Sequence, residues 1–420
     1  MKIKLNNNNL YILLLIWSII VPYSNNYELT FFSWLLILCF GIQRRYSISI
    51  IKCVIPYFII VSIAILVGLF KNDSFYFMIR DITYLIKPIF GFLLGYQLFK
   101  KIKFNTYTPF DWLTIIGLIL ASIHTILIFY AIGIKGARTI ADIRFYSGYF
   151  SDFEIYIFCI LLFKKYFKFS ISPKFLTFAT YIIGFSAFMY LARTNFIQFG
   201  ILFLGLKGFL SLSKKTIILY TTILFTGILG YGAIITYNPN RNGEGLEGFL
   251  YKLKVAPFEP FKTYINRNDY KDFNDNYRSY ENIQTVRQMT NDGVNTLIFG
   301  KGIGSKVDLK QEVLLGDMYL RYISILHNGF MIVFLKSGLL GLVVYLFTII
   351  YFFKNPKSSN VSVKHINLIF VATGIFLLIS NWVFLGFYNL TESKSILIGF
   401  LIAYRELLLN EKYTNYTPIS

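Results

Sequence analysis

Residues 327–353 read HNGFMIVFLKSGLLGLVVYLFTIIYFF, and Lys336 is the one charged side chain among them. A helix needs about 20 mostly apolar residues to cross the hydrocarbon layer of a bilayer. This stretch therefore predicts a transmembrane helix, with His327 at the end where a long polar segment enters it.

Comparable apolar stretches recur through most of the chain, which has 420 residues, of which 55% are hydrophobic and 15% are charged. A soluble globular domain carries about a quarter charged residues. The sequence therefore predicts an all-α fold, a polytopic integral membrane protein with about 12 transmembrane helices. The predicted spans are 8–24, 28–43, 50–70, 82–99, 110–132, 147–163, 175–192, 195–212, 216–236, 327–353, 365–387 and 393–410.

The Lys and Arg residues, which give the chain a formal net charge of +20, fall mainly in short clusters between apolar stretches. Basic residues stay on the cytoplasmic side of a membrane during insertion. Membrane topology therefore explains the charge, and nucleic acid is not an expected partner. The alternation of the clusters predicts twelve spans with the N- and C-termini both cytoplasmic. The clusters include Arg44-Arg45, Lys100-Lys101, Lys164-Lys165 and Lys214-Lys215.

The longest polar stretch divides the chain into three parts. Residues 1–236 hold the first nine predicted helices, residues 237–326 form a large loop on the outer side, and residues 327–420 hold the last three helices and the C-terminus. Loops of this length usually carry function or are disordered. Apolar residues at helical spacing predict a helix over Tyr280–Asn291, so we expect a partly helical cap over the membrane core.

Several reaction classes lack their characteristic motifs. The chain contains no Walker phosphate loop, no G-x-G-x-x-G at a strand–helix junction and no H-E-x-x-H. Its three histidines, His124, His327 and His365, are too few for a metal site with several His ligands. The three cysteines lie in apolar stretches and indicate neither a zinc site nor a disulfide framework. We therefore expect no metal and no cofactor.

His327 is the first candidate for catalysis, because the predicted topology places it at the outer membrane surface. A neutral histidine there can accept a proton from a hydroxyl group, since an unperturbed histidine titrates near pH 6.5. The alternative interpretation is a polar cap or an interfacial anchor. Gly338 and Gly341, in the span that follows, would let another helix pack closely.

Arg193 is a candidate for binding an anion. It lies in the segment LARTN (191–195), which we expect to form a tight turn between two spans on the same side of the membrane as His327. A guanidinium group can bind a phosphate through two parallel hydrogen bonds. The alternative is an arginine that reaches toward lipid headgroups.

Two further arginines, Arg278 and Arg287, flank the predicted helix of the outer loop. The segment TLIFGKGIG (296–304) follows this helix, and its glycines permit a close approach of the backbone to another group. Glycines in this pattern occur in phosphate-binding loops and in structural turns, and here no strand–helix context favours the phosphate loop.

Arg80, Tyr84 and Lys87 recur at helical spacing and predict a polar face at the outer end of the fourth span. Lys87 would lie about 10 Å deeper in the membrane than Arg80. A charge at that depth is costly and indicates a polar cavity. The alternative is a charged helix end with one lysine that reaches the interface. Other polar residues expected on the outer side are Arg138, Asp142, Arg144, Asp152 and Glu154.

The order of these motifs resembles that of the O-antigen polymerase and O-antigen ligase superfamily, a group of bacterial polytopic membrane glycosyltransferases. The resemblance is strongest over residues 185–350. It rests on Arg193-Thr194 at an outer turn, an arginine before a loop helix, LIFGKGIG (297–304), His327-Asn328 and GLLG (338–341), all on one side of the membrane.

Three positions depart from the family pattern. No tryptophan follows the loop arginine, Lys336 stands where an acidic residue is common, and Ala192 stands where a serine is common. These departures bear on the roles of individual residues more than on the resemblance itself.

The resemblance implies a glycosyltransferase that uses a glycan linked to undecaprenyl diphosphate, at the periplasmic face of the bacterial inner membrane, with the large loop in the periplasm. It implies no nucleotide sugar and no required metal. His327 would be the base that activates the acceptor hydroxyl, and Arg193 and Arg278 would hold the donor diphosphate. Further candidate substrate-binding cations, chosen by charge and side of the membrane, are Arg80, Lys87 and Arg287.

Three activities fit this outline. A polymerase moves a growing glycan from undecaprenyl diphosphate onto the next lipid-linked repeat unit, and an O-antigen ligase moves it onto lipid A core. We expect a polymerase, because ligases usually fit the shared motifs more closely than this chain does. A polysaccharide flippase is a more distant alternative, although the sequence shows no repeat symmetry.

The expected partners are donor and acceptor lipid-linked oligosaccharides, the lipid bilayer and a chain-length regulator protein.

Overall fold

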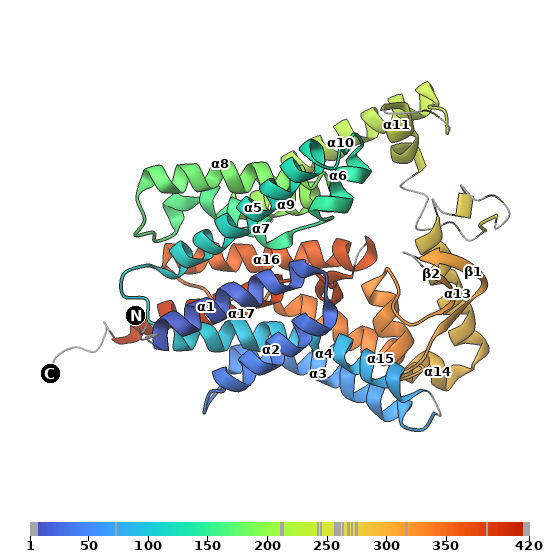
Figure 1. Cartoon of the computed structure of the whole chain (residues 1–420), viewed down its shortest axis with the longest axis horizontal. Helices are drawn as coiled ribbons and strands as arrows, with labels where there is room; N and C mark the ends of the chain where they lie inside the picture. The colour runs from blue at the N-terminus through green and yellow to red at the C-terminus, as the bar shows by residue number, and fades with distance from the viewer. Residues whose placement is uncertain are drawn as a thin grey trace.

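The protein is mostly helical (Figure 1). Among the residues that the structure describes, five helices are long and apolar enough to cross a membrane, namely α3 (Ile48–Gly68), α4 (Phe75–Lys101), α5 (Pro109–Gly133), α15 (Gly329–Tyr351) and α16 (Val361–Val383). A helix also overlaps each of the twelve spans predicted from the sequence. The prediction of a mostly helical protein with several candidate membrane spans is therefore confirmed. The computed structural model describes residues 7–71, 74–210, 214–241, 243, 246–255, 262, 264–266, 269, 272–273, 276–315, 318–383 and 385–414.

The elements follow one another along the chain with short connections, except between α10 and α15. Their bounds are α1 Asn7–Ile20, η1 Val21–Ser24, α2 Tyr27–Gly41, α3 Ile48–Gly68, α4 Phe75–Lys101, α5 Pro109–Gly133, α6 Ile140–Ser147, α7 Asp152–Leu162, η2 Lys164–Tyr166, α8 Pro173–Met189, α9 Arg193–Leu206, α10 Lys214–Tyr237, α11 Leu246–Val255, α13 Tyr277–Asn291, α14 Val294–Phe299, β1 Val307–Leu315, β2 Met318–Ile323, α15 Gly329–Tyr351, α16 Val361–Val383, η4 Gly386–Tyr388 and α17 Lys394–Thr414.

Polar side chains set where the helices begin. At α15, the side chain of Asn328 accepts hydrogen bonds from the backbone N–H groups of Phe330 and Met331, at 2.9 and 3.2 Å. At α5, Thr108 and Asp111 form a reciprocal capping box just ahead of the apolar run. Such caps satisfy N–H groups that have no partner within the helix, so the starts of these helices are encoded locally.

The helices pack into one bundle, in which α4 lies along α17, α3 along α15 and α9 along α16. Small residues allow the closest of these contacts. A Cβ atom at Gly95 of α4 would lie 1.9 Å from the carbonyl oxygen of Ile396 in α17, so only glycine fits there. Close approach of backbones at small residues is typical of helix packing in membranes.

The described residues between α10 and α15 form a cap at one end of the bundle, whereas α1 begins and α17 ends toward the opposite end (Figure 1). The helix predicted over Tyr280–Asn291 is confirmed as α13. The cap also contains an antiparallel hairpin of β1 and β2, which pairs Val307 with Ile323 and was not predicted from the sequence. The described part of the cap is therefore partly helical, as predicted, and the hairpin is its unpredicted part.

The glycine-rich segment joins the cap to the bundle. The backbone N–H groups of Lys301, Gly302 and Ile303 donate to the carbonyl groups of Leu335, Lys336 and Ala64, at 2.7, 3.1 and 2.9 Å. These N–H groups are therefore already engaged by α15 and α3. The geometry favours the structural turn over the phosphate loop.

Candidate functional site

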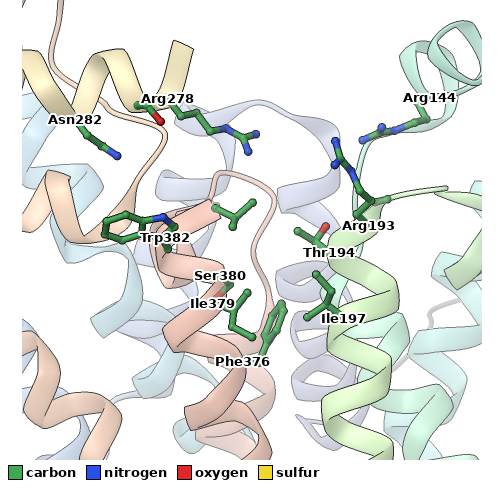
Figure 2. A pocket seen from close by; sticks show the side chains of 13 residues that line it. Arg144, Arg193, Thr194, Ile197, Arg278, Asn282, Phe376, Ile379, Ser380 and Trp382 are labelled. Carbon is green, nitrogen blue, oxygen red and sulfur yellow. The ribbon is translucent and has the colours of Figure 1, made fainter. Parts of the chain in front are cut away.

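A pocket of about 430 Å³ lies where the cap meets the start of α9 and the end of α16. Its walls come from four separate segments, namely α6, the start of α9, α13 and the end of α16 (Figure 2). The residues that line it are Arg144, Ala192, Arg193, Thr194, Ile197, Arg278, Ser279, Asn282, Phe376, Ile379, Ser380, Trp382 and Val383.

Three arginines surround the mouth of this pocket: Arg144 from α6, Arg193 from α9 and Arg278 from α13 (Figure 2). Figure 2 shows the side chains of Arg144 and Arg193 pointing toward each other. Neither of these two forms an ion pair with a carboxylate among the described residues. Like charges that converge in this way favour a bound anion between them.

Arg144 is held in place by its own short segment. Its guanidinium group donates to the backbone carbonyl of Tyr149 at 3.3 Å and lies 5.4 Å from the centre of the Tyr149 ring. Partial burial, together with the positive charge of Arg193, lowers the pKa of Arg144. A negatively charged ligand would relieve this repulsion.

Arg193 is the first residue of α9, which confirms the predicted turn between two apolar helices. Ala192 precedes it and provides no side-chain cap, and Leu191 adopts a positive φ of 49° in the turn. The N-terminus of a helix carries a partial positive charge that favours anions. The backbone of α9 therefore adds to the positive potential of the three guanidinium groups.

Below the arginines the pocket wall is apolar. Figure 2 shows Ile197 of α9 facing Phe376 and Ile379 of α16 there. Two buried polar atoms of the pocket, Asn282 Oδ1 and Ser380 Oγ, make no hydrogen bond among the described residues. The pocket thus combines a cationic mouth, unengaged polar atoms and an apolar floor.

His327 does not line this pocket, but it is tied to the helix that does. Its Nδ1 atom lies 3.0 Å from Oε1 of Glu281, which is one helical turn after Arg278 on α13. The His327 side chain is 47% exposed. The structure therefore links three of the predicted residues, His327, Arg193 and Arg278, through α13 and one pocket.

Three other predicted residues do not line the pocket. Arg80 donates to Ser324 of the cap and lies 4.8 Å from the centre of the Phe77 ring. Lys87 is buried, and its ammonium group donates to the backbone carbonyls of Asn389 and, at 2.7 Å, Leu390. A polar cavity was predicted around this charge, but backbone carbonyls between α16 and α17 accept its hydrogen bonds instead.

The third, Arg287, is exposed on α13. It follows Arg278 by about two and a half helical turns, which places it on the opposite face of the helix. Only Arg278 of this pair therefore faces the pocket.

Two acidic residues predicted on the outer side lie inside the bundle. Asp152 pairs with Lys394 at 2.9 Å, and this ion pair joins α7 to α17. Glu154 accepts hydrogen bonds from Ser186 and Tyr190, which joins α7 to α8 and to the turn before Arg193. Both carboxylates therefore have partners within the bundle.

Sequence reasoning missed Glu281, Asn282 and Trp382. The first two follow Arg278 by three and four residues, so a helix through this segment would have placed them on the same face. Trp382 lies at the end of α16, and no local pattern marked it.

Comparisons with protein-family models, with curated proteins and with solved structures find no match to this chain.

Proposed function

We propose that this protein is a membrane glycosyltransferase that elongates a polysaccharide at the outer face of a bacterial inner membrane. In this proposal it transfers a growing glycan from undecaprenyl diphosphate to the next lipid-linked repeat unit, as a polymerase of the O-antigen type does. The observation that carries the proposal is the convergence of Arg144, Arg193 and Arg278 above an apolar wall.

The chemistry of a lipid diphosphate fits both parts of this pocket. Its two phosphates carry negative charge at the level of the headgroups, where the guanidinium groups lie. Its isoprenoid chain is apolar and would extend along Ile197, Phe376 and Ile379, which belong to apolar helices. A soluble anion would match the arginines but not this wall.

The proposed reaction needs only groups that the chain and its substrates supply. The acceptor hydroxyl loses its proton to His327, and its oxygen forms a bond with the anomeric carbon of the donor. The bond from that carbon to the diphosphate oxygen breaks, and the electron pair leaves with the lipid diphosphate. Arg193, Arg278 and Arg144 stabilise the charge that develops on the leaving group.

A topology of twelve spans, with both termini in the cytoplasm and the cap in the periplasm, completes the proposal. The cap and the three arginines lie at one end of the bundle, and the start of α1 and the end of α17 lie toward the other (Figure 1). An even number of crossings would produce this arrangement. The positive-inside distribution of the basic clusters supports the same orientation.

Deletion of the gene in its host tests the activity, with the surface glycolipid resolved on a gel. A polymerase deletion leaves lipid A core that carries one repeat unit. Complementation with Arg193→Gln or Arg278→Gln should fail to restore the ladder, whereas Arg287→Gln, a matched change of an exposed arginine on α13, should restore it. Long lipid-linked polymer that never reaches the core would identify a ligase, and an unchanged ladder would contradict the proposal.

A further inference from the structure

The carboxylate of Glu281 holds His327 at two points. Its Oε1 atom lies 3.0 Å from Nδ1 of the imidazole, and its Oε2 atom accepts the backbone N–H of His327 at 3.1 Å. The side chain of Glu281 is only 1% exposed, whereas that of His327 is 47% exposed. A buried acid thus fixes both the backbone and the ring of a histidine that remains accessible.

Tyr277 supports the ring from a third direction. Its ring meets the imidazole edge to face, with a centroid distance of 5.7 Å and an interplanar angle of 84°. Tyr277 precedes Glu281 by one turn of α13, so the two side chains lie on the same face of the helix. Burial, and then the negative charge of Glu281, raise the pKa of Tyr277, which keeps this phenol neutral.

The hydrogen-bond pattern determines which ring nitrogen carries the proton. An ionised carboxylate accepts hydrogen bonds and cannot donate one, so a hydrogen bond between such a carboxylate and Nδ1 of His327 requires the proton to be on Nδ1. In a neutral imidazole the lone pair then resides on Nε2. No hydrogen bond engages Nε2 among the described residues, so this atom is available to a substrate hydroxyl.

We propose that Glu281 is the positioning residue of the transfer reaction, which fixes His327 in the Nδ1–H tautomer and presents Nε2 to the acceptor hydroxyl. This inference rests on the proposed function. Nε2 takes the proton as the hydroxyl oxygen bonds to the anomeric carbon, and the lipid diphosphate departs with the electron pair of the broken bond. The carboxylate then stabilises the imidazolium ion until its proton is released to water.

The placement of Glu281 also relates the base to the leaving group. Arg278, which lines the arginine pocket, precedes Glu281 by three residues on α13. One rigid helix therefore carries a cation for the donor diphosphate and the residue that orients the base. Such a helix sets a fixed spacing between the two reacting ends, which is the geometric requirement for transfer between bound substrates.

A kinetic comparison in nanodiscs tests the proposal, with the undecaprenyl-diphosphate-linked repeat unit isolated from host membranes as substrate. Glu281→Gln keeps the shape of the side chain and removes its charge, and we expect kcat to fall about 10- to 100-fold with little change in the donor KM. Glu312→Gln, the same change at an exposed residue of β1, should match the wild type.

A double variant separates positioning from a general structural effect. If Glu281 acts through His327, then Glu281→Gln with His327→Ala should be no slower than His327→Ala alone. A double variant that loses activity multiplicatively, or a Glu281→Gln variant with at least half the wild-type kcat, would overturn the proposal.

The tautomer of His327 can also be measured in the wild-type protein, without a substitution at Glu281. We expect ¹⁵N spectra of histidine-labelled wild-type protein to show His327 protonated at Nδ1 and not at Nε2, with the signal assigned by its absence in His327→Ala. An Nε2-protonated ring would overturn the inference. A wild-type protein that transfers no glycan would contradict the proposed function, whereas an active protein with an active Glu281→Gln variant would contradict only the role of Glu281.

Discussion

The ammonium group of Lys336 lies 2.5 Å from Oδ2 of Asp81, and both side chains are 2% exposed. Asp81 also accepts the backbone N–H of Gly304 at 2.8 Å. The one charge in the apolar stretch 327–353 is thus neutralised by α4, and the same carboxylate attaches the glycine-rich segment of the cap.

This ion pair predicts an asymmetric response to mutation. Lys336→Met removes the nearer of two cations from a buried carboxylate and leaves only the partly exposed Arg80, 3.9 Å away, so we expect a loss of about 3 kcal/mol of stability. Adding Asp81→Asn removes that charge and keeps an acceptor for Gly304, so the double variant should recover most of the loss. Thermal unfolding in nanodiscs measures both, with the exposed Lys135→Met as the control. A double variant as unstable as the single one would contradict this role for the pair.

The arginine pocket predicts a difference between two arginines of the same helix. In the proposed function, Arg278→Gln would remove a charge-assisted hydrogen bond to the donor, which is typically worth about 1.5–3 kcal/mol, and should reduce kcat/KM about 10- to 100-fold. Arg287→Gln, on the exposed face of α13, should change it by less than about twofold. Initial rates of both variants and the wild type, measured with the lipid-linked repeat unit as substrate, test this expected difference. Equal losses in the two variants would show that the pocket is not the donor site.

Close packing of α4 against α17 predicts the effect of adding a single methyl group. Gly95→Ala would bring its Cβ into the carbonyl group of Ile396, and we expect a destabilisation of about 1–3 kcal/mol. Gly200→Ala in α9 meets no atom within 4 Å and should be neutral or slightly stabilising. Unfolding temperatures of the two variants provide the comparison, and equal values would contradict the tight contact.

The hairpin of the cap predicts a dependence of local stability on pH. Hydrogen bonds from Arg321 hold the pKa of Asp308 well below its usual range. A carboxylate with a depressed pKa stabilises the folded state above its unfolded pKa, about 3.9, and loses that contribution as the pH falls further. Asp308→Asn should therefore speed proteolysis of the hairpin at pH 7. The difference in proteolysis rate between the variant and the wild type should become smaller below about pH 4. A difference that stays constant down to pH 3 would rule out the ion pair as its cause.

Some of the architecture was predictable because its causes are local. Apolar stretches of membrane-spanning length, and the polar loop between residues 237 and 326, are visible in the sequence, and the structure has a helix at each predicted span. The turn before Arg193 was also predictable, since two apolar runs meet there. The twelve membrane crossings themselves remain a prediction.

Other features depend on pairs of residues far apart in the chain. Glu281 precedes His327 by 46 residues, and Asp81 precedes Lys336 by 255, so no periodic pattern could connect them. Arg144 belongs to an eight-residue helix, too short for a clear pattern. The hairpin was missed because β1 and β2 lie in a polar loop, where only the helical period was recognised.

The origin of the pocket in four separate segments has a consequence for biogenesis. Its arginines lie on α6, α9 and α13, but its apolar wall depends on α16, near the end of the chain. A nascent chain that ends after α9 has Arg144 and Arg193, but it lacks Arg278 and the apolar wall of α16. The pocket therefore becomes complete only after α16 has been made and has packed against α9, late in the synthesis of the chain.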